Sequence, residues 1–596
     1  MSGDALLDID PRSGLKGGNM RGQHSVAPSP FFSSMRGISG TRHKLKELWR
    51  ILHDPSLLSI LIVVVGFLGL FVVFPLVKVL QNSIFYKGTF IPQYFIEFFS
   101  GRPYVIRPFF NSLIVASLVA VISTILGFIF AYATVRANIP GRRFFRGIGL
   151  LSTISPPFIM ALAAIMLFGH NGIITSFIRK NFGISWNIYG LPGLILTETL
   201  AFFPMTFLTL EGVLEGIDPS LEEAAMDLGA SGLRTFFRVT LPLASPGIAA
   251  ALLLAFIRSL EDFANPIVIQ GRFPVLTTQA YLAITGMYNI PLGTTLSVIL
   301  LIPTLLAFLL QRYWLSRKSF ITITGKASAA RFVPISPKVK WGLAGLVLFF
   351  SLLILSFYGL VFLGSFTKLW GIDNTFTVNN YRYVFSTGVR YLSNSLKLAA
   401  IATSIGGFLG IVIAYVVTKK GIIGRGLIDF LSMLNFAVPG IVIGIGYILA
   451  FNTYPIILTG TASIVILVLI SQRMPVVVRD SVAILQQLDP AIDEAAADLG
   501  ADFLQNFGRV ILPLAAPALI AGMVYMFAAC MTSVSAVAMV ASSKWYPVTL
   551  AMLSQIDLGA LSVAAAYGTT IIAVVLGVIL IFDTTMRKIL AWREKA

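Results

Sequence analysis

The amino-acid sequence predicts an all-α membrane protein with about twelve transmembrane helices, arranged as two six-helix parallel repeats. Composition, the lengths of the apolar runs and an internal duplication support this fold class. Of the 596 residues, 56% are hydrophobic and 12% are charged, and the mean hydropathy is +0.86. These values lie far outside the range of soluble globular proteins, so most of the chain is expected to lie in lipid.

Twelve apolar runs are long enough to cross a hydrocarbon core of roughly 30 Å. The first six are expected at about residues 57–78, 108–134, 148–168, 190–213, 243–264 and 292–312, and the second six at about 342–366, 393–417, 427–451, 462–486, 514–540 and 563–583. Because unpaired backbone groups are costly in lipid, runs of this length are predicted to be helices.

The net charge of +18 follows the predicted topology. Lys and Arg gather in alternate loops, at about residues 36–50, 136–146, 312–340, 419–425 and 587–595. Under the positive-inside rule, both termini are therefore expected in the cytoplasm. No basic face with interleaved aromatic residues forms outside the expected spans, so we expect no nucleic-acid partner.

Residues that usually carry redox, metal or phosphate chemistry are scarce. The single cysteine, Cys530, lies in an expected span and leaves no possibility of an intramolecular disulfide or a thiolate metal site. Of the four histidines, three precede the first span, and His170 is expected in a loop. Gly325-Lys326 lacks the upstream glycine of a G-x4-G-K-[ST] phosphate loop, so ATP hydrolysis is not expected in this chain. We expect no catalytic residue and no fixed metal site.

A duplication divides the chain into two related halves. Three motifs of the first half recur in the second, Asn111-Ser112-Leu113 as Asn394-Ser395-Leu396, Pro156-Pro157 as Pro439-Gly440, and Asp218-Pro219 as Asp489-Pro490. The displacement changes from 283 to 271 positions along the chain, so the first half carries 12 extra residues, expected in an external loop at about 170–189. Since six spans are an even number, both halves have the same orientation, with any transport path at their interface.

The expected domain plan has four parts. These are a basic cytoplasmic N-terminal tail at residues 1–55, a first membrane domain at 56–315, a cytoplasmic linker at 316–340 and a second membrane domain at 341–596. The first 45 residues or so are rich in Gly, Ser, Pro and basic groups, and they lack an apolar run that could serve as a cleaved signal peptide. We expect this tail to be mobile.

One polar segment occurs in both membrane domains, at residues 218–242 and 489–513. The two copies share one spacing, with Glu223-Ala224-Ala225, Gly229 and Pro242 in the first and Glu494-Ala495-Ala496, Gly500 and Pro513 in the second. Asp218 and Asp489 are expected to cap a short helix, because an aspartate can accept from free backbone N–H groups and the proline that follows suits the first helical position. Gly229 and Gly500 are expected to end each helix with a positive φ angle.

Each short helix is expected to present a narrow apolar face made largely of small residues. The faces comprise Leu221, Ala224, Ala225 and Leu228 in the first copy and Ile492, Ala495, Ala496 and Leu499 in the second. Such a face allows close approach to a groove on another protein. Because two copies share both their spacing and their side of the membrane, a docking role is favoured over an ordinary helical loop.

The repeated segment resembles the EAA loop of binding-protein-dependent ABC importer permeases, whose pattern is EAA-x3-G-x9-I-x-L-P. Val239 and Val510 stand where that pattern has Ile. The resemblance covers roughly residues 100–315 and 385–590, and it implies a multi-pass permease of the bacterial inner membrane.

The same resemblance implies the partners and the docking residues. Two surfaces would dock on two copies of an ATP-binding subunit, one formed by Glu223, Ala224, Ala225 and Gly229 and the other by Glu494, Ala495, Ala496 and Gly500. In such importers the partner subunit binds ATP and Mg, and an extracytoplasmic solute-binding protein delivers the substrate.

Ionisable residues in the fifth span indicate where a substrate could pass. Arg258, Glu261 and Asp262 lie in this apolar run, whereas the second half carries no charge at the matching positions. Ionisable residues within spans usually face a bundle interior or a pathway. We expect Glu261 and Asp262 to line a route for a cationic substrate, with Ser533 and Ser535 opposite them. Alternatively, the two carboxylates merely reach the outer interface.

The sequence around these residues resembles the fused ferric-iron permeases of the same superfamily. The segments that carry the resemblance are SLEDFANP at 259–266, FPVLTTQ at 273–279 and MTSVSAV at 531–537. The resemblance implies ferric iron as the substrate and a ferric-binding protein as the donor. Similar permeases carry thiamine, aminophosphonates or polyamines, which remain alternatives. A secondary transporter driven by an ion gradient would explain the spans but not two EAA loops. A membrane enzyme would need clustered His or carboxylates at membrane depth, and such clusters are not evident in the sequence.

Overall fold

The computed structural model describes residues 55–593, apart from 185–186, 316–334, 419–421 and 423. Residues 1–54 of the expected tail at 1–55 and most of the expected linker at 316–340 therefore lie outside the described residues. In the described part, ten helices are long and apolar enough to span a membrane, and one bent pair brings the number to eleven. The prediction of an all-helical membrane protein is confirmed.

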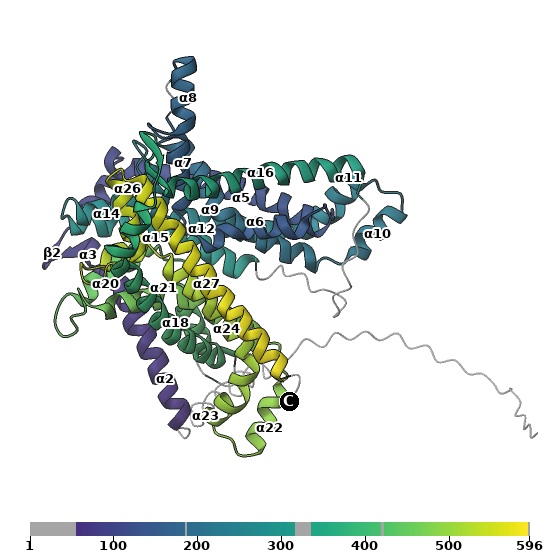
Figure 1. The fold of residues 1–596 in the computed structure, drawn as a ribbon. Helices are drawn as coiled ribbons and strands as arrows, with labels where there is room; N and C mark the ends of the chain where they lie inside the picture. The colour runs from purple at the N-terminus through teal and green to yellow at the C-terminus, as the bar shows by residue number, and fades with distance from the viewer. Residues whose placement is uncertain (1–54, 185–186, 316–334, 419–421, 423, 594–596) are drawn as a thin grey trace, which may run out of the picture. The chain divides into compact units, whose positions relative to one another are not determined.

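The helices that make up the spans follow the predicted order in both halves (Figure 1). In the first half they are α2 (Pro55–Leu68), η1 (Gly69–Val73), α3 (Phe74–Ile84), α5 (Pro103–Val135), α6 (Arg142–Ile154), α7 (Ile159–Phe168), α9 (Leu191–Gly216), α12 (Leu241–Glu261) and α15 (Ile290–Leu309). In the second half they are α16 (Pro337–Ser365), α18 (Val389–Thr418), α19 (Arg425–Leu434), α20 (Gly440–Phe451), α21 (Ala462–Leu485), α24 (Leu512–Met531) and α27 (Leu561–Arg593).

Short elements connect these helices. They are α4 (Gln93–Phe99), α8 (Ile173–Phe182), α13 (Ala264–Ile269), α14 (Leu276–Thr285), η3 (Leu310–Leu315), α17 (Asn379–Ser386), α25 (Ser535–Val540), α26 (Val548–Asp557), and the antiparallel hairpins β1 (Phe85–Tyr86) with β2 (Thr89–Phe90) and β3 (Thr367–Leu369) with β4 (Asp373–Phe376). Helix α8 lies at the expected insertion, where the second half has only the loop 452–461.

The third span of each half is a broken helix, so the prediction of one continuous helix at 148–168 and another at 427–451 was wrong. Helix α6 ends at Ile154 and α7 begins at Ile159, while α19 ends at Leu434 and α20 begins at Gly440. Proline lacks a backbone N–H and pushes the preceding residue out of the helical region. Ser155, which precedes Pro156-Pro157, is accordingly extended, with φ −90° and ψ 153°.

The fifth spans end earlier than predicted. Helix α12 stops at Glu261 and α13 follows, and α24 stops at Met531 before α25 begins. The second of these spans is also bent by 64° between Leu504–Pro517 and Leu519–Met531. Proline inside a helix removes one backbone hydrogen bond, and the bend lies at Pro517.

The duplicated Asn-Ser motif has the same structural role in both halves. Ser112 Oγ accepts from the backbone N–H of Leu276 at 2.8 Å, and Ser395 Oγ accepts from that of Val548 at 2.8 Å. Asn111 donates to the carbonyl of Pro274, while Asn394 donates to that of Lys544. The motif therefore fixes the starts of α14 and α26, which follow α13 and α25 after the ends of the fifth spans.

The first span of each half contacts the opposite half as well as its own, since α3 also packs on α15 and α16 on α27. Helices α2 and α3, with η1 between them, contact α18, α19, α20 and α21, whereas α16 lies along α5, α6 and α7 (Figure 1). A π-helix leaves one backbone carbonyl poorly paired. The carbonyl of Phe71 in η1 accepts from Tyr447 Oη at 2.7 Å and from Ser471 Oγ at 3.1 Å. On the other side, Trp370, which follows α16, donates from Nε1 to the carbonyl of Met166 at 2.9 Å.

Candidate functional site

The two repeated polar segments fold into short helices, α10 (Pro219–Asp227) and α22 (Pro490–Asp498). Asp218 Oδ1 accepts from the backbone N–H of Ser220 at 3.0 Å, and Asp489 Oδ1 accepts from that of Ala491 at 2.9 Å. The predicted aspartate caps are thus confirmed in both halves. The hydrogen bond from Ser220 lowers the pKa of Asp218, because it stabilises the carboxylate form.

Each short helix ends at the predicted glycine. Gly229 has φ +85° and Gly500 has φ +79°, a left-handed conformation that glycine adopts without a steric penalty. A second short helix follows in each copy, α11 (Gly232–Thr235) or α23 (Phe503–Asn506). A π-helix, η2 (Phe236–Thr240) or η5 (Phe507–Ile511), then leads directly into α12 or α24. The two copies therefore share the same order of elements.

The predicted apolar face of α10 is exposed in large part. Leu228 and its counterpart Leu499 are each 89% exposed, and Leu221, Ala224 and Ala495 are also exposed. Ala225 and Glu223 are half-buried, and Ala496 is buried. Leu228 and Leu499 thus present apolar side chains on the surface of the two loops. The side chain of Glu494 lies outside the described residues.

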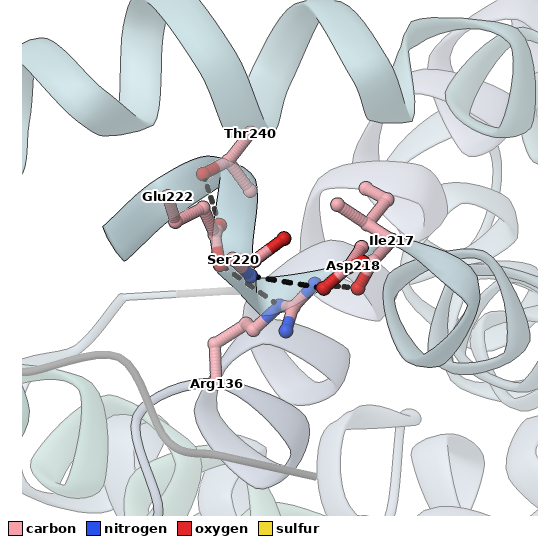
Figure 2. A network of polar contacts seen from close by, with 6 residues as sticks. All are labelled: Arg136, Ile217, Asp218, Ser220, Glu222 and Thr240. Carbon is pink, nitrogen blue, oxygen red and sulfur yellow. Dashed lines mark hydrogen bonds and ion pairs between the residues drawn. The ribbon is translucent and has the colours of Figure 1, made fainter. Parts of the chain in front are cut away.

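Glu222, the neighbour of the predicted Glu223, is the buried acidic residue of this loop. Figure 2 shows its carboxylate between Arg136 and Thr240. The Arg136 Nε atom lies 3.5 Å from Glu222 Oε2, with the two side chains 3% and 1% exposed, and Thr240 donates from Oγ1 to Glu222 Oε1. Arg136 also donates to the carbonyl of Ile217 at 2.7 Å. An acidic residue in the first turn of a helix complements the positive end of the helix dipole, but no local pattern in the sequence pointed to the distant Arg136 as a partner of Glu222.

A cavity of about 870 Å3 lies between the two halves. Helices α9 and α12 form its first-half wall, and α19, α21 and α24 form its second-half wall. One face of α12 lines it from Leu243 to Arg258, and Ile217, which lies just before α10 in the chain, also lines it. Arg312 of η3 and Asp429 of α19 both line this cavity, and they form a salt bridge that joins the two halves.

Arg258 lines the cavity, and it contacts residues of both halves. Its guanidinium pairs with Glu261 at 3.0 Å and lies over the ring of Phe436, 4.5 Å from the ring centroid. Both ionic side chains are largely buried. Glu261 therefore faces a permanent cation of its own helix, and it is Arg258 that lines the cavity.

Asp262 holds the start of α13. Its Oδ1 accepts from the backbone N–H of Ala264 at 2.9 Å, and its Oδ2 accepts from Asn265 Nδ2 at 2.7 Å. Its carbonyl accepts from Thr277 Oγ1 at 2.7 Å. The second half repeats the last contact, since Thr549 donates to the carbonyl of Ser533 at 2.8 Å.

The two predicted serines lie beside α20 and α21. Ser533 is buried, with its Oγ 3.3 Å from Gln472 Oε1. Ser535, which begins α25, approaches Gly440 so closely that a Cβ at that glycine would lie 2.1 Å from its Oγ. Ser533 thus has a hydrogen-bond partner within its own half, and Ser535 packs against Gly440 of the same half.

The sequence analysis missed further ionisable residues within the spans, among them Glu198 and Arg473. Glu198 of α9 is 1% exposed and accepts from Ser259, and Arg473 lies inside α21. The rule that identified Arg258 and Glu261, an ionisable residue within an apolar span, applies equally to both. His170 stacks on Tyr189, with ring centroids 5.1 Å apart. Among the described residues, no group of three or more His, Cys, Asp or Glu is placed to hold a metal ion.

Comparison with known families identifies the chain. Residues 123–319 and 406–590 each match the family described as "Binding-protein-dependent transport system inner membrane component", and the two matches together cover more than half of the chain. This chain belongs to that family. It is a membrane permease component of an ABC transporter, a multi-pass inner membrane protein, and it is not the ATPase.

Relatives of this binding-protein-dependent permease include two ferric transport proteins. The ferric transport system permease protein FbpB of Actinobacillus pleuropneumoniae is 35% identical over 89% of this chain and 78% of that protein. A putative ferric transport system permease protein, FbpB 1 of Haemophilus influenzae, is 36% identical over 81% of this chain and 78% of that protein. The molybdenum permease ModB of Escherichia coli is 32% identical over 35% of this chain and 92% of its own length. A crystal structure of a bacterial alginate ABC transporter with its periplasmic protein aligns at 18% identity and a TM-score of 0.37, over 44% of this chain and 97% of that chain.

Proposed function

We propose that this permease carries ferric iron, delivered by an extracytoplasmic ferric-binding protein, into the cytoplasm. The observation that carries this proposal is the similarity, at 35% and 36% identity over more than four fifths of the chain, to two permeases named for ferric transport. The segments SLEDFANP and MTSVSAV, which end the two fifth spans, support the same cargo.

The ATP-binding partners dock on the loop helices under this proposal. Two copies of that subunit, which bind ATP and Mg, contact the surfaces formed by Glu223, Ala224, Ala225 and Gly229 on α10 and by Glu494, Ala495, Ala496 and Gly500 on α22. The exposed Leu228 and Leu499 support this assignment. Their apolar side chains are in contact with water in the free chain, and a docked partner would cover them, which favours binding.

The cargo passes between the halves, near the ends of the two fifth spans. Glu261 and Asp262, with Ser533 and Ser535, supply the oxygen atoms that a hard cation prefers. The cavity between the halves is lined by Arg258, three positions before Glu261 in the chain. Since Arg258 pairs with Glu261, a passing cation competes with an internal cation for that carboxylate, which favours transient guidance over tight binding.

An uptake experiment tests the cargo. The chain is reconstituted in proteoliposomes with its ATP-binding subunit and binding protein, and uptake of radioactive ferric iron, thiamine, an aminophosphonate and a polyamine is measured. We expect uptake of iron alone; ATP-dependent uptake of another of these compounds without iron would contradict the proposal.

Glu261→Gln is the variant that tests the route. It removes one charge and leaves the α13 cap intact, whereas Asp262→Asn would place an amide against Asn265 Nδ2. We expect slower iron uptake at normal ATPase activity, and the parental rate of uptake would exclude Glu261 from the route.

A further inference from the structure

The network around Glu222 joins four elements at one buried point (Figure 2). Arg136 directly follows α5, Ile217 follows α9, Glu222 lies in α10, and Thr240 ends η2, directly before α12. Three membrane-spanning helices of the first half thus meet the loop helix through side chains rather than through the chain connection alone. Thr240, like Arg136 and Glu222, is almost fully buried, with 1% of its surface exposed.

The contacts use each polar group of the network for a different element. One carboxylate oxygen of Glu222 accepts from Thr240, and the other faces Arg136. The Arg136 guanidinium in turn donates to the carbonyl of Ile217, which is one of the unpaired carbonyls at the end of α9. Removing one member leaves a buried charge or a buried carbonyl without its partner, so the network resists any movement of α10 relative to the spans.

The second half does not repeat this arrangement in its sequence. The positions that match Arg136, Glu222 and Thr240 carry Lys419, Asp493 and Ile511. Ile511 is buried and has no hydroxyl to donate. The hydrogen bond from the residue that precedes the fifth span is therefore specific to the first half.

We propose that Arg136, Glu222 and Thr240 form a rigid joint, which makes α10 move as one body with α5, α9 and α12. The inference rests on the proposed docking of an ATP-binding subunit on α10. When the ATP-binding subunit moves α10, α9 and α12 then move with it and displace the cavity wall that they form, because the loop does not bend. The three residues are positioning residues, because they contact neither the cargo nor ATP.

A coupling measurement tests the joint. Glu222→Gln, Arg136→Gln and the double variant are purified with the ATP-binding subunit and reconstituted, and iron imported per ATP hydrolysed is compared with the parental complex. We expect each single variant to assemble and to lower this ratio by about fivefold or more, a typical size for coupling between two sites. The double variant should lose no more than the worse single variant, because both changes break one joint.

Two further variants separate coupling from folding. Glu215→Gln makes the same chemical change at an exposed position next to the loop, and it should keep the parental ratio. Thr240→Val removes only the hydroxyl from a buried position, so it should assemble normally and still lower the ratio. A parental ratio in assembled Thr240→Val or Glu222→Gln complexes would overturn the joint.

A second readout does not depend on the cargo. Spin labels at Ser245 on α12 and Ala516 on α24 report the change in distance between the two halves when ATP binds. We expect this change to shrink in Glu222→Gln and to persist in Glu215→Gln, and an unchanged response in Glu222→Gln would also overturn the joint. Failure of the ATP-binding subunit to bind even the parental chain would instead contradict the proposed docking.

Discussion

The adjacent residues Glu222 and Glu223 differ in burial and in their contacts. Glu223 is half-buried on α10, while Glu222 is enclosed by Arg136 and Thr240. The sequence indicated the helix cap, the helix end and the exposed leucines, because these depend on residues within a dozen positions of each other. It did not indicate the buried pair, because Arg136 and Glu222 are 86 positions apart and only the folded chain brings them together.

The cap of α10 provides a prediction at this scale. In Asp218→Ala, the N–H of Ser220 loses its acceptor, and we expect amide hydrogen exchange in α10 to become about fivefold faster at neutral pH. Because the folded-state pKa of Asp218 is lowered, the cap is complete above the ordinary aspartate pKa of about 3.9 and is lost as the pH falls through the lower, folded-state value.

Asp218→Asn is the control for that titration. An asparagine caps as well as an aspartate does but carries no titrating group. We expect exchange in this variant to match the parent at neutral pH and to stay slow in acid, where exchange in the parent accelerates relative to it. Equal acid sensitivity in the parent and in Asp218→Asn would assign the effect to another group.

At the scale of elements, the spans are well predicted where apolar length alone decides and poorly predicted where a helix is interrupted. The break between α6 and α7 follows from Pro156-Pro157, and both prolines were visible in the sequence. Proline inside a span does not always break it, however, because Pro204 lies within the continuous helix α9. Neighbouring helices decide between these outcomes, and a single sequence does not show them.

The exposed leucines of the two loop helices give a prediction for docking. We expect Leu228→Ser and Leu499→Ser to change the stability of the chain by no more than about 0.5 kcal/mol, because both side chains lie on the surface. Burying a leucine against a partner is worth about 1.5–3 kcal/mol, so each variant should bind the ATP-binding subunit at least about tenfold more weakly. Affinity is measured on the detergent-solubilised complex.

Leu558→Ser is the matched control for the two docking variants. Leu558 is 74% exposed and follows α26, far from either loop helix in the sequence. The control should bind the subunit as the parent does. Unchanged affinity in the double variant Leu228→Ser/Leu499→Ser would refute these leucines as part of the docking surfaces.

At the scale of the whole molecule, the order of the spans was predictable but their partners were not. A lipid-facing helix such as α2 carries no pattern that distinguishes a neighbour from lipid, since both are apolar. The packing of α2 and α3 on the second half therefore left no sign in the sequence. Charge, by contrast, predicts orientation, because Lys and Arg in short loops favour the cytoplasmic side.

Cysteine labelling in whole cells tests that orientation. The parental chain has one cysteine, the buried Cys530, so it should give little background. We expect Ser231→Cys, in the loop after α10, to resist an impermeant external reagent, and Phe182→Cys, exposed at the end of α8, to react. Labelling of Ser231→Cys from outside, with Phe182→Cys protected, would reverse the topology.

The exchange of first spans has a consequence for biogenesis. Helices α2 and α3 leave the ribosome early, but α18 to α21, which they contact, are made only after the whole first half. At about 5–20 residues per second, this delay is on the order of tens of seconds. Early in that interval, α2 lacks the second-half helices that it contacts in the finished protein, and α5 to α7 lack their contact with α16. A messenger RNA truncated before codon 389 would therefore yield an inserted polypeptide that lacks the second-half helices on which α2 packs. We expect such a polypeptide to be a substrate for membrane quality control.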